Sequence, residues 1–274
     1  MYMKIRKLAY IAVVVLLALI FGFSAYRVGD YVLESRKARK EFEELAAMKE
    51  QAAQQASAPE ETEAMEDEEP DAPGEETTEA TEPGILADYA PFYEANPHVV
   101  GWIKIDGTVV DYPVMQTPEH RDYYLKRNFE GERSEHGCIY IREECDMNEP
   151  SDNITVYGHN MNDGSMFACL LDYEDKKTWE QNSLIFFDTL TEYHTYKIFA
   201  VFKTTASLNA GFKYHNMIDA PSKEAFDEFI ATAKALSFYD TGITPKYGDK
   251  IICLSTCEYT LEHGRFVVAA YRIW

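Results

Sequence analysis

Three side chains in separate segments of this sequence have the chemistry needed for acyl transfer. Cys257 lies within LSTCEY, His159 follows the apolar segment NITVY, and Arg265 opens the apolar segment RFVVAAYRI. A thiolate can attack a carbonyl, an imidazole can protonate the leaving amine, and a cation can stabilise the oxyanion. We therefore expect cysteine-based acyl transfer if the fold brings these three residues together.

The spacing around LSTCEY shows how Cys253 and Cys257 are placed relative to each other. In an extended strand Cys253, Ser255 and Cys257 share one side, and the two cysteines are about 13 Å apart, too far for a disulfide. Most free cysteines are buried and inert, so packing is the alternative role for each. The residues alone leave this role open for both Cys253 and Cys257. The short connection EYTLEHG would bring Arg265 back beside Cys257.

Composition and charge narrow the possible functions. The chain has 274 residues, of which 46% are hydrophobic and 14% aromatic, so it can form a packed core. Its formal net charge is -21, and residues 60–82 contain 12 acidic side chains and no basic one. No segment forms the basic stripe that nucleic-acid binding requires, so we expect no nucleic-acid partner.

An apolar segment close to the N-terminus predicts a membrane anchor. Residues 8–26 read LAYIAVVVLLALIFGFSAY and contain no charged residue over 19 positions. This length suits a membrane-spanning helix better than the shorter core of a cleaved signal peptide. We assign 1–27 to a cytoplasmic tip and transmembrane anchor. Basic residues flank the segment on both sides, so their number alone does not set its orientation.

Two polar segments separate the anchor from a single folded domain. Residues 28–56 have the composition of a polar helical stalk. Residues 57–84 are rich in Glu, Pro, Thr and Ala, and they contain too little apolar surface to fold, so we expect a disordered acidic linker. The globular, catalytic domain is expected at 85–274.

The pattern of the globular domain is mainly β. Asp106-Gly107 joins two apolar segments and favours a tight type I′ hairpin turn. Short helices are expected at 86–94, 165–173 and 222–237, the last after the start signal Pro221-Ser222. Eight short strands favour a barrel or sandwich with inserted helices. The expected strands are 99–105, 108–115, 137–141, 153–157, 183–188, 193–204, 250–256 and 265–273.

The domain also resembles a known family. It is similar to class B sortases in five segments that follow the family's order: NPHVVGWIKIDGTVVDYPVMQ, DYYLKRNFEGE, ITVYGHNMNDGSMFACL, IICLSTCEYT and GRFVVAAYRI. The resemblance implies an eight-stranded sortase-type β-barrel, with the helix 222–237 in the long connection between the sixth and seventh strands. It also implies a type II orientation, in which a single-pass protein of the cell membrane has its catalytic domain on the extracellular face.

The resemblance assigns roles to particular residues. Cys257 matches the family's nucleophile, His159 matches the general acid/base, and Arg265 matches the arginine that contacts the substrate backbone and the oxyanion. Ser255 and Thr256 match pocket residues. The backbone amide of Glu258 is a candidate oxyanion donor.

The same resemblance implies the reaction and its partners. Such an enzyme cleaves a C-terminal sorting signal of the LPxTG or NPxTN type in a surface protein and forms a thioester. An amine of lipid II or a peptidoglycan stem, or a pilin lysine, then resolves the thioester. No cofactor is implied.

Two alternatives remain open from the residues. The segment SEHGC at 134–138 resembles the SHGC stretch of L,D-transpeptidases, which would make Cys138 the nucleophile, but Glu135 interrupts the match. A non-catalytic envelope binding module is the second alternative. No metal site is expected, because the acidic run 143–146 lacks the alternating ligands and glycine of a calcium loop.

Overall fold

The computed structural model describes residues 2–56, 84–207 and 209–274. The expected linker at 57–84 therefore lies outside the described residues, except for Gly84. The chain divides into two compact units, Met1–Glu41 and Phe42–Trp274. Each unit is described by itself.

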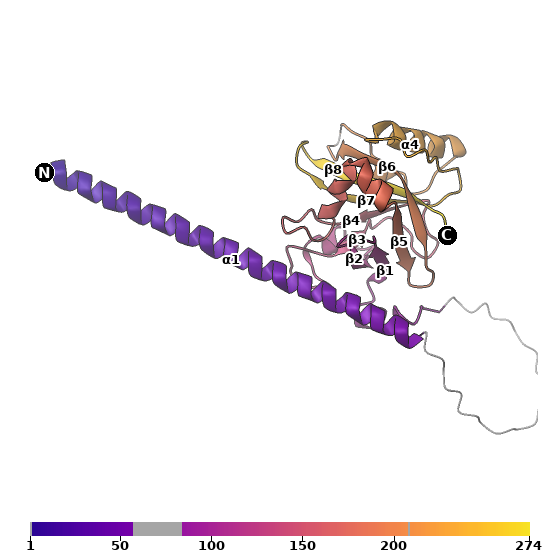
Figure 1. The fold of residues 1–274 in the computed structure, drawn as a ribbon, viewed down its shortest axis with the longest axis horizontal. Coiled ribbons are helices and arrows are strands. Elements are labelled where there is room, and N and C mark those ends of the chain that lie inside the picture. Colours follow the sequence, from indigo (N-terminus) through magenta and orange to yellow (C-terminus); the bar gives the residue numbers. More distant parts are fainter. Residues whose placement is uncertain (1, 57–83, 208) are drawn as a thin grey trace, which may run out of the picture. The chain divides into compact units, whose positions relative to one another are not determined.

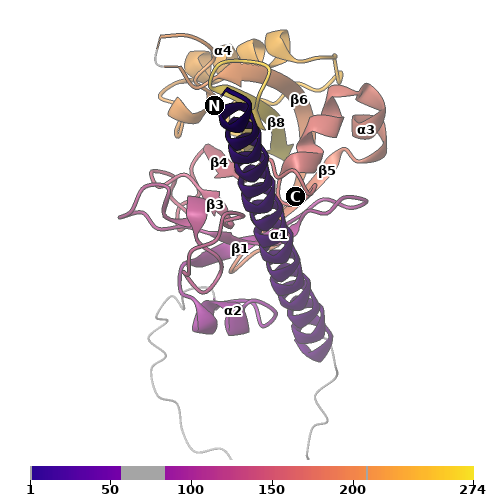
Figure 2. The ribbon, with the colours of Figure 1, turned by 90° about the vertical axis from the view of Figure 1, so that its left-hand side faces the viewer.

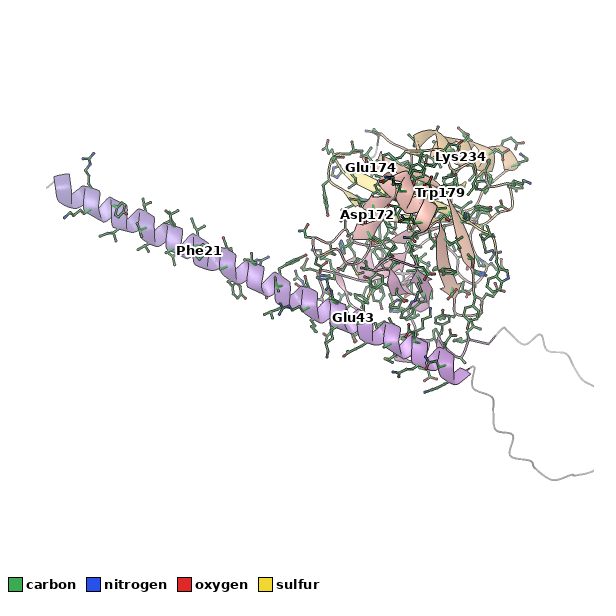
Figure 3. The ribbon with its side chains drawn as sticks, in the orientation of Figure 1. Phe21, Glu43, Asp172, Glu174, Trp179 and Lys234 are labelled. Atoms are coloured by element: carbon green, nitrogen blue, oxygen red, sulfur yellow. The ribbon has the colours of Figure 1, made fainter. Side chains whose placement is uncertain are left out.

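The helix α1, Tyr2–Ala56, contains all the described residues of the first unit (Figure 1). Within the described parts of the chain, α1 is the one helix that is long and apolar enough to cross a membrane, judged by length and composition. Phe21, labelled in Figure 3, lies in its apolar part and is 75% exposed. A row of exposed apolar side chains suits contact with lipid, so the helix fits the expected anchor.

The second unit contains a closed eight-stranded barrel, as the sequence predicted. Its strands are hydrogen-bonded in the order β1-β2-β3-β4-β7-β8-β6-β5. Most neighbours are antiparallel, but β2 pairs with β3 and β4 pairs with β7 in parallel. The strands are β1 (Val99–Lys104), β2 (Asp111–Met115), β3 (Ile139–Ile141), β4 (Asn153–Tyr157), β5 (Leu184–Thr189), β6 (Thr195–Thr205), β7 (Ile251–Glu258) and β8 (Gly264–Arg272).

Short helices occupy the connections between the strands. In Figure 2, α2 and α4 lie on opposite sides of the barrel. The α-helices of the second unit are α2 (Ala90–Ala95), α3 (Lys176–Gln181) and α4 (Lys223–Leu236), and the 3-10 helices are η1 (Tyr123–Lys126), η2 (Ala168–Glu174) and η3 (Tyr214–Asn216). The expected helix 222–237 corresponds to α4, which begins where the Ser222 hydroxyl accepts a hydrogen bond from the amide of Ala225 at 3.3 Å. As expected, it lies between β6 and β7.

The structure confirms one local prediction with shifted bounds and contradicts another. The short helix expected at 165–173 is the 3-10 helix η2, which begins at Ala168, after the positive φ of 57° at Met166. The turn at Asp106-Gly107 is not type I′, which needs positive φ at both central residues. Only Gly107 of the two has positive φ, at 73°, and the Ile105 amide bonds to the Val110 carbonyl across a longer connection.

The outer face of β6, β7 and β8 forms an apolar core with α4. Phe226 and Ile230 of α4 are buried against this face, which includes Cys253 and Val267. Cys253 is 0% exposed, and burial raises the pKa of its thiol. This confirms that Cys253 is a packing residue and fixes the outward face on which residue 257 also lies.

The last part of α1 belongs to the same compact unit as the barrel. The sequence placed the start of the folded domain at 85, but Phe42 and Leu45 are buried, and the Phe42 ring lies 5.0 Å from the ring of Tyr112 in β2. The Lys49 ammonium lies 5.0 Å from the centre of the Trp102 ring. The unit thus extends beyond the expected boundary because these side chains bury apolar surface on the barrel.

This packing predicts the behaviour of soluble fragments. A fragment starting at 36 should be more stable than one starting at 85 by about 3 kcal/mol, because burying Phe42 and Leu45 removes two large apolar side chains from water. Urea unfolding followed by tryptophan fluorescence measures the difference. Equal unfolding free energies would show that residues 36–56 do not stabilise the barrel.

Candidate active site

The pairing of β4, β7 and β8 brings the three expected residues to one end of the barrel. Tyr157 at the end of β4 is the register partner of Ser255 in β7, and the two strands are parallel. His159 and Cys257 each follow two residues later in the same direction. Cys257 is the register partner of Arg265 in the antiparallel β7–β8 pair. Register partners project from the same face of a sheet, so the thiol and the guanidinium share one face.

Cys257 is partly exposed and its backbone is held in place from β4. The side-chain amide of Asn160 donates a hydrogen bond of 3.0 Å to the Cys257 carbonyl. One strand position earlier on the same face, the hydroxyls of Ser255 and Tyr214 lie 2.6 Å apart. Of the five cysteines, Cys138, Cys145 and Cys253 are buried, and Cys169 and Cys257 are partly exposed.

His159 is oriented by a backbone carbonyl. Its Nε2 lies 2.6 Å from the carbonyl oxygen of Leu125 in η1. A carbonyl only accepts, so Nε2 carries the proton and Nδ1 is the atom that can take up or release one. Burial lowers the pKa of His159, against the opposing effect of the Leu125 hydrogen bond. The neutral imidazole is therefore favoured near pH 7.

Arg265 begins the strand that leaves the site. Its Nη1 donates a hydrogen bond of 3.0 Å to the Gly264 carbonyl, and its side chain is partly buried. On the other side of β8, Arg265 is the register partner of Thr204 in β6. The backbone of Arg265 thus lies in a strand that is paired on both edges. This pairing and the Gly264 hydrogen bond limit the positions that the guanidinium can adopt.

Thr256 and Glu258 lie on the opposite face of β7 from Cys257, because side chains alternate along a strand. The Thr256 hydroxyl donates a hydrogen bond of 2.8 Å to the Gly158 carbonyl, just before His159. The side chain of Glu258 is buried and accepts hydrogen bonds from the Thr260 and Leu261 amides. Both side chains brace the strand end that carries Cys257. Neither shares its face.

The alternative nucleophile has a different environment. Cys138 is 1% exposed, and its backbone amide is bonded to the Tyr124 carbonyl. A peptide carbonyl could not reach this thiol without rearrangement of the core. The expectation for 134–138 from the L,D-transpeptidase resemblance therefore has no support in the geometry.

Comparison with known proteins decides the family. A model described as a sortase domain matches residues 103–273, which is more than half of the chain. The chain belongs to the sortase family. It is 36% identical to sortase B of Listeria monocytogenes over 63% of this chain and 69% of the relative. It is 31% identical to sortase B of Staphylococcus aureus over 64% of this chain and 70% of the relative.

A solved structure supports the same fold. The structure of a Staphylococcus aureus sortase B-substrate complex superposes with a TM-score of 0.72 at 24% identity, over 88% of this chain and 98% of that one. The protein is thus a class B sortase, with the expected mainly β barrel, and a cysteine transpeptidase by family. Sortases act on sorting-signal substrates and are associated with the membrane of Gram-positive bacteria, which agrees with the apolar part of α1.

Sequence reasoning missed three contacts of the sortase site. The Leu125 carbonyl orients His159, Asn160 fixes the Cys257 carbonyl, and the Tyr214 hydroxyl meets Ser255. Leu125 and Asn160 lie inside segments that carried the family resemblance, so those segments already pointed to them. Tyr214 lies in the long β6–β7 connection and carried no such signal.

Proposed function

We propose that Cys257 is the nucleophile of this sortase, His159 its general acid/base and Arg265 its oxyanion-stabilising residue. The observation that supports this most directly is the convergence of one thiol, one imidazole and one guanidinium on the adjacent ends of β4, β7 and β8. Among the five cysteines, Cys257 alone shares its sheet face with an arginine partner across the strand pair.

The first half of the reaction forms a thioester. Neutral His159 takes the proton of the Cys257 thiol. The resulting thiolate attacks the carbonyl carbon of the scissile peptide bond, and the negative charge moves to the carbonyl oxygen. Arg265 stabilises that oxyanion, together with the backbone amide of Glu258. The C–N bond then breaks as protonated His159 gives its proton to the leaving amine. The products are an acyl-Cys257 thioester and the released C-terminal fragment.

The second half of the reaction consumes an amine. Neutral His159 removes a proton from the incoming amine, which attacks the thioester carbonyl. The Cys257 sulfur leaves as a thiolate, and a new amide bond joins the surface protein to the acceptor. The lowered pKa of His159 favours the neutral form that this step needs.

The neighbouring residues have supporting roles in this proposal. Ser255 lies on the same face of β7 as Cys257, and the Tyr214 hydroxyl holds its side chain in place. Thr256 holds Gly158, and Glu258 holds the β7–β8 turn. The Lys203 ammonium, 3.6 Å from the Glu258 carboxylate, partly neutralises this buried charge. Thr256 thus ties β7 to the residue before His159, and Glu258 holds the turn that follows Cys257.

The substrates follow from this chemistry and from the family. We assign to the enzyme surface proteins with an LPxTG- or NPxTN-like sorting signal, and as acceptor an amine of lipid II, of a peptidoglycan stem or of a pilin lysine. The catalytic domain would then lie on the extracellular face of the cell membrane, with α1 as its single-pass anchor. Such an arrangement places the barrel where both substrates are found.

A peptide assay tests this proposal. The fragment 36–274 is incubated with quenched fluorescent peptides that contain an LPxTG- or NPxTN-type signal, with and without an amine such as triglycine. We expect cleavage of one signal class, and a peptide–triglycine product by mass spectrometry when the amine is present. A peptide of the same composition in scrambled order serves as the control. Binding of both signal peptides without cleavage would instead favour a non-catalytic binding module.

A further inference from the structure

The segment 134–138 has no role in the reaction proposed above. It nevertheless contacts two segments next to His159, which are the loop after β4 and the 3-10 helix η1. The His136 side chain is 1% exposed, and its Nε2 lies 3.0 Å from Oδ2 of Asp163. Asp163 lies four positions after His159, in the loop between β4 and η2. A buried histidine thus joins the start of β3 to the loop that follows the candidate acid/base.

Asp163 organises that loop. Its Oδ1 accepts hydrogen bonds from the Ser165 amide at 3.0 Å and from the Ser165 hydroxyl at 2.6 Å. Burial opposes ionisation, but the hydrogen bonds from Ser165 and His136 outweigh it and lower the pKa of Asp163 to about 2. The carboxylate is therefore charged near neutral pH, and it accepts a hydrogen bond from the N–H at His136 Nε2. The loop closes where the Phe167 amide donates to the His159 carbonyl at 2.9 Å.

The next residue, Gly137, packs against the backbone of Leu125, whose carbonyl orients His159. Gly137 has a φ of 60°, and a Cβ there would lie 2.5 Å from the Leu125 carbonyl oxygen and 2.6 Å from that of Tyr124. The Leu125 carbonyl is the acceptor for His159 Nε2. The Cys138 amide donates to the Tyr124 carbonyl at 3.0 Å, which fixes the distance between the two segments.

Both supports of His159 therefore depend on one short segment. We propose that His136 is a positioning residue: through its hydrogen bond to Asp163, and with Gly137 packed under Leu125, it fixes the His159 ring for proton transfer at the active site. The proposal rests on the role of His159 given above. His136 itself contacts no substrate. This account gives the SEHGC segment a function without making Cys138 a nucleophile.

Two substitutions at His136 separate positioning from folding. His136→Phe keeps a ring but removes the hydrogen bond to Asp163, whereas His136→Gln keeps an N–H donor at nearly the same reach as Nε2. Single-turnover acylation of fragment 36–274 is measured with the sorting-signal peptide that the parent enzyme cleaves. We expect His136→Phe to lower the acylation rate at saturating peptide by about 10- to 100-fold. The peptide concentration for half-maximal rate should stay nearly unchanged. His136→Gln should recover most of the rate.

His194 provides a matched control. It is also a buried histidine, 7% exposed, and its Nε2 lies 3.3 Å from Glu192, in the β5–β6 turn. His194→Phe should leave the acylation rate unchanged. Asp163→Asn, which keeps the side-chain volume, should lower the rate in the same direction as His136→Phe. It provides the test if His136→Phe does not fold, as judged by circular dichroism.

The outcomes distinguish this proposal from the proposed function. If Cys257→Ala and His159→Ala are inactive but folded His136→Phe acylates at the parent rate, His136 has no positioning role. An equal loss in His136→Gln and His136→Phe also overturns it, because the donor then does not matter. If His159→Ala itself retains full acylation, the role of His159 fails and the positioning proposal fails with it.

Discussion

Replacement of Cys257 by alanine should lower the acylation and cleavage of the sorting-signal peptide by at least about 10,000-fold. No other group on this face of β7 replaces the Cys257 thiol as the acyl acceptor, because Ser255 is bonded to Tyr214 and Cys253 is buried under α4. Cleavage is measured with the quenched peptide. Acylation is measured by the mass of the intact protein after brief incubation.

Cys138→Ala is the matched control for this substitution. It removes a buried thiol that lies before β3, and its effect should be limited to stability, at about 1–2 kcal/mol for a small buried side chain. The reverse pattern, with Cys138→Ala inactive and Cys257→Ala active, would support the L,D-transpeptidase-like alternative. Full activity in both variants would show that neither thiol is the nucleophile.

The second large effect is expected at Arg265. Arg265→Ala should lower the acylation rate by about 100- to 1,000-fold, because it removes the cation nearest to the developing oxyanion. Arg265→Lys should recover only part of this loss. A lysine keeps the charge, but it lacks the planar fork of donors that can contact two carbonyl groups at once. Single-turnover rates at saturating peptide measure both effects.

Arg272 offers a control on the same strand. It lies at the other end of β8, paired with Tyr196 of β6, and Arg272→Lys should leave acylation unchanged. An Arg265→Lys variant with the full parent rate would show that charge alone suffices. If Arg265→Ala changed only the peptide concentration needed for half-maximal rate, Arg265 would bind the substrate without stabilising the oxyanion.

The strands and the order of residues along them could be predicted from the sequence. Alternation in IICLSTCE placed Cys253 and Cys257 on one face. The family resemblance identified Cys257 as the nucleophile, and Cys253 is buried as a packing residue would be. The eight strands were predicted because each is a short apolar segment bounded by turn residues. The helix α4 was predicted from the start signal Pro221-Ser222, and Ser222 is its N-cap residue.

The neighbours of each strand could not be predicted from local pattern. The parallel pairing of β4 with β7 joins residues about a hundred positions apart, and this pairing places His159 beside Cys257. Local propensity also did not predict the left-handed backbone at Met166, after which η2 begins. The Tyr214 contact depends on the path of the long β6–β7 connection, which no periodicity encodes.

The central claim is that Cys257 carries the acyl group, and mass mapping of the trapped intermediate tests it most directly. Fragment 36–274 is mixed with the cleaved signal peptide, quenched in acid and digested. We expect an adduct equal to the N-terminal part of the signal, labile to hydroxylamine, on the peptide that contains Cys257. An adduct on Cys169, the other partly exposed thiol, or on any other residue would contradict the account.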